Sequence, residues 1–415
     1  MAACGLDFGT SNTTLGRIVS GVPTLARLEG THVTIPSAIF FEPGREPVIG
    51  RAGMAAYVDG RPGRLMRSLK SVLGTGLIEE TTPLGRERLR FRDVIARYLA
   101  AVKARAEAEA GEALDTVVHG RPVHFVDGDA EADRRAEDTL AEIAAAVGFR
   151  AVSFQYEPIA AALDYERSVT REEIALIADI GGGTSDFSIV RLSPERHARA
   201  ERADDILAND GVRIGGTDFD RQLSLGTVMP LLGLGSPMKR RELDVPSGYF
   251  HDLATWSSIN RLYNAKTLRE IDETVRDCAR PDLVSRLRAV VEAERGHALA
   301  AAVEAAKIEA SDGGTAGIAL DFAQTGLAAG VDRASLAAQT ETLARRIAER
   351  VEGCLRQAGL GRAAIDAVFL TGGSTRVPHV RAAIVACLPG ARVVEGDTFG
   401  SVGIGLTLEA ARRAA

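Results

Sequence analysis

The sequence predicts an α/β fold built from two similar halves, and two observations support this prediction. A run of apolar residues followed by an aspartate, glycine and then hydroxyl or amide side chains occurs at residues 5–13 and again at 174–190. Segments of strand character alternate with amphipathic helical segments around these two copies, which is typical of α/β domains. The chain has 415 residues, more than one compact core accommodates, so a duplicated domain is expected.

The second copy is the more informative. Its apolar residues 174–178 show no alternation, as expected of a strand that is covered on both faces. Asp179 ends the apolar run, and glycines 181–183 allow backbone N–H groups to approach an anion without a Cβ atom in the way. A buried aspartate needs a cation, and a hydrated divalent metal is the obvious candidate. The alternative is a plain glycine hairpin whose aspartates bond to their own turn.

The first copy contains Asp7 and Gly9, followed by the polar residues Thr10, Ser11 and Asn12. Two such hairpins, separated by about one domain length, suggest half-molecules whose phosphate-binding loops face each other across a cleft. Further segments follow in the expected alternation: a strand at 34–41, a helix at 91–113, a strand at 116–126 with a break at Arg121-Pro122, and a helix at 130–147.

Two charged residues before the second copy are candidates for a site. Lys70 is one of five lysines in a chain that otherwise uses arginine, and it lies in a short amphipathic segment at 65–74. A lone lysine is ordinarily a solvated surface charge. Glu157 precedes Pro158 at the start of a helix. There it is either a simple N-terminal capping charge or, at a cleft, a group that positions water or a metal.

The second half repeats the glycine-plus-hydroxyl pattern at residues 209–220, where a strand meets a helix that starts near Thr217. Residues 227–300 have a different composition, with long charged helical segments and no glycine-rich phosphate-loop pattern. This indicates a subdomain or an insertion. The helix that closes this region places three polar residues on one face, Glu304, Lys307 and Ser311. An exposed Glu–Lys pair is the alternative interpretation there.

The last third predicts a helix at 330–357, a strand and glycine turn at 365–378 with a helix starting near Pro378, and a final helix at about 400–415. The turn contains Gly372 and Gly373 beside Ser374 and Arg376, which could accept a flat ring and its ribose. The alternative is a strand-to-helix turn with a serine cap.

Composition narrows the function classes. A net charge of −6 and a pI of about 5.8 argue against binding to nucleic acid or to an anionic membrane. The sequence has no long apolar segment and no leader pattern, so we expect a cytoplasmic protein. The four cysteines are scattered and are predicted to be buried free thiols, and the dispersed histidines are assigned to no metal.

Taken together, the two aspartate–glycine hairpins, the 209–220 segment, the Glu304 helix and the Gly372 turn resemble the nucleotide-binding fold of actin, sugar kinases and the seventy-kilodalton heat-shock chaperones. Segments 157–162, 179–186 and 372–378 narrow the resemblance to the heat-shock chaperone family. It implies duplicated actin-like ATPase domains of ribonuclease-H-like fold, with two lobes around a nucleotide cleft. The implied divisions are domain I at 1–172, with a C-terminal helix at 398–415 packing back on it, and domain II at 173–397, with a helical subdomain at about 225–310.

The resemblance also implies ATP or ADP and Mg²⁺ as bound groups. Asp7 and Asp179 would hold the Mg²⁺, largely through water, and Lys70 would lie close to the γ-phosphate. Glu157 would position water or the metal, and the attacking water would lie between Thr184 and Asp186. The phosphates would contact Thr10, Ser11 and Asn12 from domain I and Gly182, Gly183 and Thr184 from domain II. The implied adenosine pocket comprises Gly215, Gly216, Glu304, Lys307, Ser311, Gly372, Gly373, Ser374 and Arg376.

The function implied by this resemblance is a slow, Mg²⁺-dependent ATPase that acts as a chaperone-like switch on a protein client or a regulated enzyme. A nucleotide-exchange factor or co-chaperone is a further candidate partner. The sequence departs from the family at Ile308, where an arginine commonly stacks on adenine, and around 399–402. The family's peptide-clamping β-domain and its linker are not expected in this short chain. The alternatives are a sugar or acid kinase of the same superfold, or a non-hydrolysing scaffold or filament protein.

Overall fold

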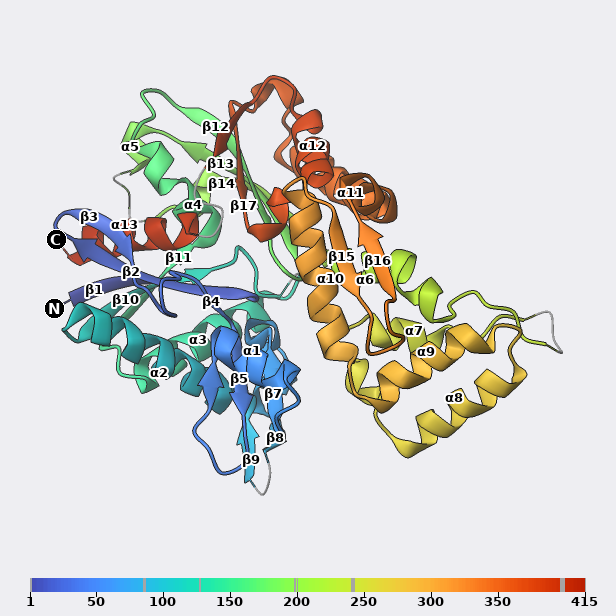
Figure 1. Cartoon of the computed structure of the whole chain (residues 1–415). Coiled ribbons are helices and arrows are strands. Elements are labelled where there is room, and N and C mark those ends of the chain that lie inside the picture. The colour runs from blue at the N-terminus through green and yellow to red at the C-terminus, as the bar shows by residue number, and fades with distance from the viewer. Residues whose placement is uncertain are drawn as a thin grey trace. The chain divides into compact units, whose positions relative to one another are not determined.

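The computed structural model describes residues 2–84, 87–126, 128–197, 199, 201–239, 243–395 and 400–414. The chain divides into two compact units. The first unit comprises residues 1–213, 349–375 and 384–415, and the second comprises 214–348 and 376–383. Both hairpins and both large sheets belong to the first unit (Figure 1). The boundary proposed from the sequence at residues 172 and 173 falls between those sheets and stays a prediction, whereas the one at 397 and 398 lies outside the described residues.

The first large sheet has the strand order β11-β10-β1-β2-β3, and the short strand β4 also pairs with β2. Strand β1 runs parallel to β10 and antiparallel to β2, so the first aspartate–glycine loop joins the two central strands. The bounds are β1 (Ala2–Phe8), β2 (Asn12–Val19), β3 (Val22–Leu25), β4 (Ile35–Pro36), β10 (Leu114–Arg121) and β11 (Ala151–Tyr156).

The second large sheet repeats this topology. Its order is β14-β13-β12-β17-β18, in which β12 pairs antiparallel with β13 and parallel with β17. The outer pairings also match, because β13 and β14 are antiparallel whereas β17 and β18 are parallel. The duplication expected from the two hairpins is therefore present in the fold. The bounds are β12 (Glu173–Ile180), β13 (Ser185–Leu192), β14 (Ile206–Val212), β17 (Ala367–Thr371) and β18 (Arg392–Glu395).

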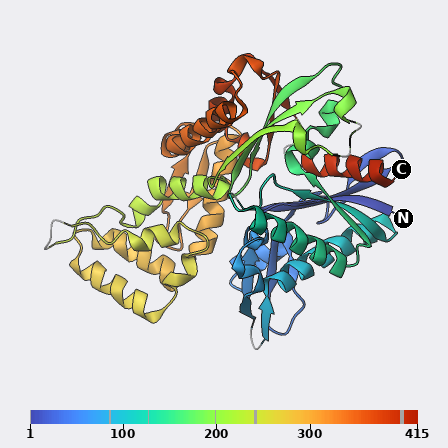
Figure 2. The ribbon, with the colours of Figure 1, turned by 180° about the vertical axis from the view of Figure 1, so that it is seen from behind.

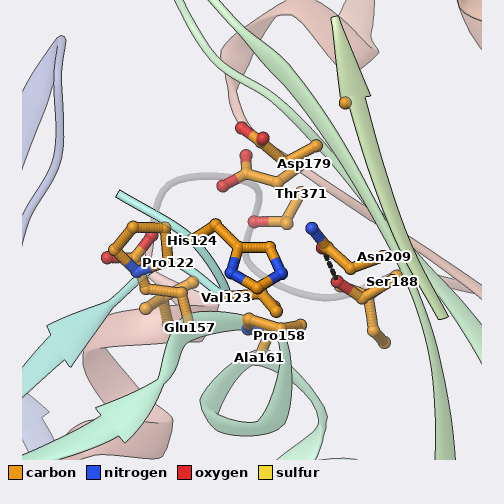
Figure 3. Close-up of a pocket in the computed structure, with 14 residues that line it drawn as sticks. Pro122, Val123, His124, Glu157, Pro158, Ala161, Asp179, Ser188, Asn209 and Thr371 are labelled. Atoms are coloured by element: carbon orange, nitrogen blue, oxygen red, sulfur yellow. Dashed lines mark hydrogen bonds between the residues drawn. The ribbon is translucent and has the colours of Figure 1, made fainter. Parts of the chain in front are cut away.

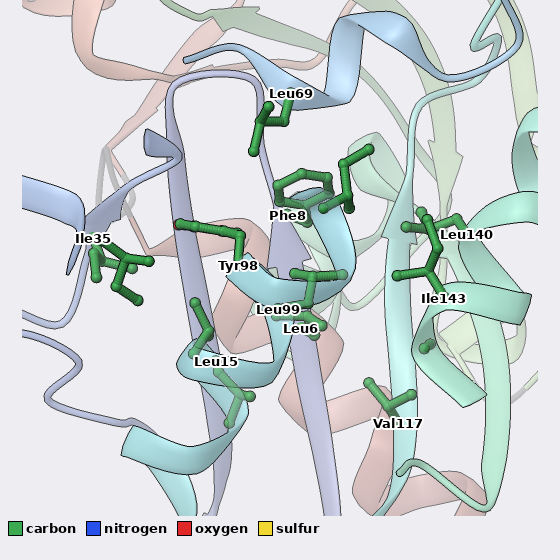
Figure 4. Packing of buried hydrophobic residues seen from close by; sticks show 14 of the residues in the cluster. Leu6, Phe8, Leu15, Ile35, Leu69, Tyr98, Leu99, Val117, Leu140 and Ile143 are labelled. Carbon is green, nitrogen blue, oxygen red and sulfur yellow. The ribbon is translucent and has the colours of Figure 1, made fainter. Parts of the chain in front are cut away.

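Two layers of helices cover the first sheet. Helices α2 (Phe91–Ala110) and α3 (Ala130–Ala146) bury one face in a core that includes Leu6, Phe8 and Tyr98 (Figure 4). The other face carries α13 (Ser401–Ala414), which lies along β1 and β2 and against α4 (Glu157–Glu166) in both views (Figures 1 and 2).

Helix α13 packs closely because glycines face its neighbours. An added Cβ atom at Gly405 would lie 1.8 Å from the carbonyl oxygen of Ala160 in α4. An added Cβ at Gly5 of β1 would lie 2.3 Å from the backbone of Leu406. The backbones therefore touch without intervening side chains, and the sheet and both helices form one layered body.

The remaining elements of the first unit are small. Helix α1 packs beside the three-stranded sheet β6-β5-β7, and β8 pairs with β9. Their bounds are β5 (Ala38–Phe41), β6 (Val48–Ile49), α1 (Gly50–Val58), β7 (Arg64–Arg67), β8 (Thr81–Leu84), β9 (Glu87–Arg90) and α5 (Pro194–His197). Helices α11 (Arg333–Ala358) and α12 (Pro378–Cys387) contribute residues to both units.

The second unit is mainly helical. Helix α10 packs against α6 and against the two-stranded sheet of β15 and β16, and α8 packs on α9. The bounds are α6 (Gly216–Thr227), α7 (Gly248–Leu253), α8 (Ala265–Asp277), α9 (Pro281–Glu292), α10 (Gly296–Ser311), β15 (Ala316–Ala319) and β16 (Ala328–Val331).

Most predicted elements occur, with shifted ends. The strand expected at 34–41 is divided into β4 and β5, and the segment at 65–74 is a strand followed by a short 3₁₀ helix at Leu69–Val72. The helix expected to reach residue 113 ends at Ala110, because Gly111 adopts the left-handed conformation with φ 71°. All four cysteines are buried free thiols, as predicted. Among the described residues, no helix has both the length and the apolar character needed to cross a membrane.

Candidate functional site

The two aspartate–glycine loops meet in the first unit. Asp7 lies near the end of β1, opposite Thr14 on β2, and Asp179 lies near the end of β12, opposite Asp186 on β13. The loops touch at Gly182, where an added Cβ atom would lie 2.1 Å from Oγ of Ser11. A side chain at this position would therefore force the Ser11 hydroxyl to move. The structure confirms that the two hairpins face each other.

The same backbone bond closes both loops. The N–H of Gly9 donates to the carbonyl of Asn12 at 2.9 Å, and the N–H of Gly181 donates to the carbonyl of Thr184 at 2.9 Å. In each loop a serine hydroxyl from elsewhere in the chain also donates to the carbonyl of the leading glycine. Ser37 bonds Gly9 at 2.7 Å, and Ser374 bonds Gly181 at 3.0 Å. These serines fix the loop conformation, so the loop amides are held ready for an anion.

Lys70 and Glu157 form a close pair beside the first loop. Lys70 lies on the 3₁₀ helix that follows Ser68, a residue in the left-handed region with φ 55°. Its Nζ lies 2.5 Å from Oε1 of Glu157, the first residue of α4, and only 9% of the lysine side chain is exposed. Burial alone would lower the pKa of Lys70, but the charges of Glu157 and Asp7 outweigh it and leave the pKa raised. Lys70 is thus a buried cation, and a solvated surface charge is excluded.

The positive charge of Lys70 does not balance the burial of the Asp7 and Asp179 carboxyl groups and the negative charges near them, so both pKa values are raised. Burial raises the pKa of Asp7 to about 8, and the charge of Glu157 adds to the rise. Burial also raises the pKa of Asp179 to about 7, and the negative charge of Asp186 is the second cause of this rise. A divalent cation near both aspartates would supply the missing charge, and Mg²⁺ commonly takes one or two carboxylates while keeping several waters. These residues therefore fit a hydrated Mg²⁺.

Asp186 and Thr184 complete the second hairpin. The hydroxyl of Thr184 donates to Oδ2 of Asp186 at 3.0 Å, and the Asp186 side chain is exposed. Gly183 faces open space, since an added Cβ atom there would meet nothing within 4 Å. The loop therefore presents backbone and a hydroxyl group to any ligand between the hairpins. Among the described residues, no group of three or more His, Cys, Asp or Glu side chains is arranged to hold a metal ion.

A cavity of about 50 Å³, open to water-sized molecules, adjoins these residues within the first unit (Figure 3). Its lining includes three residues of the predicted site, Glu157, Asp179 and Asp186. The sequence interpretation missed its other polar lining residues, namely His124, Ser188, Asn209 and Thr371. Polar positions inside apolar strands were the available signal, as at Ser188 between Phe187 and Ile189.

The Gly372 turn follows β17 and closes over the second hairpin. Gly372 has φ +82°, and an added Cβ atom would lie 2.4 Å from the carbonyl oxygen of Ile180 and 2.5 Å from Oδ1 of Asp179. Gly373 and Ser374 begin a short 3₁₀ helix, and Pro378 is the first residue of α12, as predicted. Glycine is needed at 372 both for its backbone conformation and for the approach to Asp179.

The remaining predicted residues gather in the second unit. Nζ of Lys307 lies 2.8 Å from Oδ1 of Asp220 and donates to the carbonyl of Gly216 at 3.2 Å. Lys307 is buried, so the alternative of an exposed Glu304–Lys307 pair is wrong. The Ser311 hydroxyl donates to the carbonyl of Lys307 at 2.8 Å.

Three further residues of the predicted adenosine pocket have defined places in this unit. Gly215 receives a capping contact, because its N–H donates to Oδ2 of Asp218 at 3.0 Å. Glu304 is half-buried on α10. Arg376 pairs with Asp312 at 2.9 Å. The helix predicted to start near Thr217 begins at Gly216, where Gly215 is the N-cap residue.

Two sheets of one topology, whose central hairpins meet at their aspartate–glycine loops, define a duplicated actin-like ATPase fold. A family comparison specifies the branch. The family model described as Hsp70 protein matches residues 73–225 and 287–396, which is more than half of the chain. The chain therefore belongs to the Hsp70 family.

Curated relatives are chaperones of this family. The chain is 26% identical over 400 residues to "Chaperone protein HscA homolog" of Aromatoleum aromaticum, covering 92% of this chain and 53% of the relative. It is 28% identical over 426 residues to the protein of the same name from Bordetella petrii, covering 98% and 57%. It is 26% identical over 380 residues to "Chaperone protein DnaK" of Halobacterium salinarum, covering 92% and 51%. The chain thus spans about half the length of these relatives.

Proposed function

We propose that this chain binds ATP and ADP together with Mg²⁺, hydrolyses ATP slowly, and acts as a nucleotide-driven switch on a protein partner. The observation that supports this function best is the convergence of the two hairpins. Their loops touch at Gly182 and Ser11, and each hairpin carries an aspartate whose pKa is raised. Phosphoryl transfer depends on positioning and charge neutralisation, and this arrangement provides for both.

The two loops would bind the phosphates. Backbone N–H groups of Gly182 and Gly183 and hydroxyl groups of Ser11 and Thr184 are donors on the two loops, and anions bind such clusters of donors. Thr10 and Asn12 would complete the first loop. The bonds from Ser37 and Ser374 hold these loops in place before nucleotide arrives, so little ordering is required on binding.

Lys70, Glu157, Asp179, Thr184 and Asp186 would promote hydrolysis. Lys70 would contact the γ-phosphate, and Glu157 would orient the lysine through the 2.5 Å contact. The attacking water would lie near Thr184 and Asp186. Mg²⁺, held largely through water by Asp7 and Asp179, would neutralise phosphate charge.

Within the second unit, we assign the adenosine contacts to Gly215, Gly216, Glu304, Lys307, Ser311 and Arg376. Gly372, Gly373 and Ser374 of the first unit keep the adenosine role that the resemblance implies for them. Lys307 is held by Asp220, so its main role would be to fix α10 to the start of α6. Ile308 is 51% exposed on the same helix and would offer an apolar contact to the base.

The partner would be a protein client or a regulated enzyme, with an exchange factor or co-chaperone as a further partner. Support comes from the relatives, which are named as chaperone proteins. A matched set of binding and activity measurements tests the nucleotide part of the proposal.

ATP and ADP binding should be measured by calorimetry with Mg²⁺ and with a chelator, and hydrolysis by release of labelled phosphate. We expect Lys70→Ala to reduce hydrolysis by about 100-fold or more while ATP still binds. Asp179→Asn should weaken the dependence of binding on Mg²⁺. Lys266→Ala is the control, because the Lys266 side chain is 80% exposed. Failure of the wild-type protein to bind nucleotide at any Mg²⁺ concentration would refute the proposal.

A further inference from the structure

The cavity beside the second hairpin has polar groups that the proposed roles leave unused. One face of the second sheet contributes Ser188 and Asn209, and the loop after β10 contributes His124. Ser188 Oγ donates to Oδ1 of Asn209 at 2.8 Å, which fixes the carboxamide and leaves its nitrogen free to donate elsewhere. No described residue forms a hydrogen bond with the Asn209 carboxamide nitrogen or with the His124 imidazole. Figure 3 shows His124 and Asn209 bordering the same space.

Arg121 connects the start of the loop that carries His124 to neighbouring elements. Arg121 donates to the carbonyl of Pro122 at 3.1 Å and to Oδ2 of Asp133 at 2.8 Å. Its guanidinium group also lies 5.1 Å from the centre of the Tyr156 ring. These contacts join the beginning of the loop to α3 and β11.

Size and charge determine what this cavity holds. A volume of about 50 Å³ accommodates roughly three to five water molecules, at about 10–15 Å³ each. Three carboxyl groups, from Glu157, Asp179 and Asp186, line the cavity and, without a bound cation, disfavour an anion inside it. Water can both accept from the free donors and donate to the carboxylates, and cavities with several polar partners retain it.

We propose that the cavity is a water-filled vestibule that supplies the attacking water for ATP hydrolysis, and that His124 and Asn209 position its waters. This inference rests on the proposed function. In each turnover, the oxygen of one water forms a bond to the γ-phosphorus while the bond from that phosphorus to the β–γ bridging oxygen breaks. ADP and inorganic phosphate leave, and one proton is released to solvent. The vestibule replaces the consumed water beside Asp179 and Asp186.

Variants of His124 separate hydrogen bonding from shape. His124→Phe keeps a ring without a hydrogen-bonding group, and His124→Gln keeps a hydrogen-bonding group without the ring. We expect His124→Phe to slow single-turnover hydrolysis at saturating ATP by about 10-fold, His124→Gln to stay within about 2-fold of wild type, and ATP affinity to change little in either. His32→Phe, at an exposed histidine far along the chain from this loop, is the control.

A second variant fills the cavity from its apolar side. Ala161 of α4 lines the cavity, and Ala161→Leu would occupy part of its volume. We expect slower hydrolysis with unchanged ATP affinity, and a thermal unfolding scan checks that this variant is folded. If both His124→Phe and a folded Ala161→Leu hydrolyse ATP at the wild-type rate, the vestibule is refuted.

A readout without nucleotide keeps the inference independent of activity. A high-resolution crystal structure of the nucleotide-free wild-type protein should show ordered waters in the cavity, one of them bonded to the Asn209 carboxamide nitrogen. A dry cavity would refute the proposal. Absence of hydrolysis in the wild-type protein would refute the proposed function, and the vestibule's role with it. Wild-type hydrolysis that the cavity variants do not alter would refute the vestibule alone.

Discussion

The hairpin of β1 and β2 and the hairpin of β12 and β13 have the same backbone hydrogen-bond pattern but different side chains. The same turn bond closes each loop, and a serine holds the leading glycine of each. Opposite the aspartate, however, the first hairpin has Thr14, which is buried, whereas the second has Asp186, which is exposed. The first loop instead has the Lys70–Glu157 pair beside its aspartate. The two hairpins therefore share one backbone frame and carry different charged groups.

The largest expected change in stability is at the turn after β17, in the second sheet. Gly372→Ala places a methyl group in a left-handed conformation and against the carbonyl of Ile180. We expect a loss of about 3 kcal/mol in the free energy of unfolding, measured by urea denaturation. Gly390→Ala is the matched control, since an added Cβ atom there meets nothing within 4 Å. Equal stabilities of the two variants would contradict this account.

The parallel neighbours of the two central strands differ at one buried position. His119 on β10 pairs with Leu6, and Leu370 on β17 pairs with Ala178, each one residue before the aspartate. Burial lowers the pKa of His119 to about 4 from 6.5. Between those values the unfolded chain takes up a proton that the folded protein does not, so stability falls as the pH drops from about 6.5 towards 4.

His119→Leu makes the first sheet resemble the second at this position. We expect the slope of unfolding free energy against pH to decrease by up to about 1.4 kcal/mol per pH unit between pH 6.5 and 4. Urea denaturation at several pH values measures that slope. His32→Leu, at an exposed position, should leave it unchanged. An unaltered slope in His119→Leu would show that the buried imidazole makes no contribution.

The contact between the loops gives a smaller effect. Gly182→Ala forces the Ser11 hydroxyl to move, and we expect a loss of roughly 1 kcal/mol in stability together with weaker ATP binding. Gly183→Ala is the control because its Cβ would face open space. In a double-mutant cycle, Ser11→Ala should recover part of the lost stability but not the ATP affinity. Strict additivity of the two changes would argue against contact between the loops.

The two anchoring serines give the smallest effect. Ser374→Ala removes one hydrogen bond to Gly181 and should cost about 0.5 kcal/mol of stability. Ser37→Ala should cost slightly more, because the Ser37 hydroxyl also forms a hydrogen bond with the Thr13 hydroxyl at 3.0 Å. Chemical denaturation measures the stability loss of both variants. A greater loss for Ser374→Ala than for Ser37→Ala would show that the second loop depends more on its anchoring serine than the first loop does.

Local patterns were sufficient to predict the hairpins and the strand–turn–helix segment at Gly372. Aspartate, glycine and hydroxyl residues are close together in sequence there, so a short stretch contains the whole signal. The cavity was not predictable in this way. His124, Ser188 and Asn209 come from three separate segments, and only the register of β13 with β14 and the loop after β10 bring them together. The partner of Lys307 was missed for the same reason, because helical spacing gives the face of α10 but not its neighbour on α6.

The glycine-lined contact of α13 with β1 has a consequence for biogenesis. About 400 residues separate the two elements in the chain, and at typical rates of synthesis the ribosome takes roughly 20 to 80 s to make them. During that time the face of β1 that packs against α13 has no native cover. The first sheet therefore cannot finish folding in the order in which it is translated, and the nascent chain must avoid aggregation until residues 401–414 arrive.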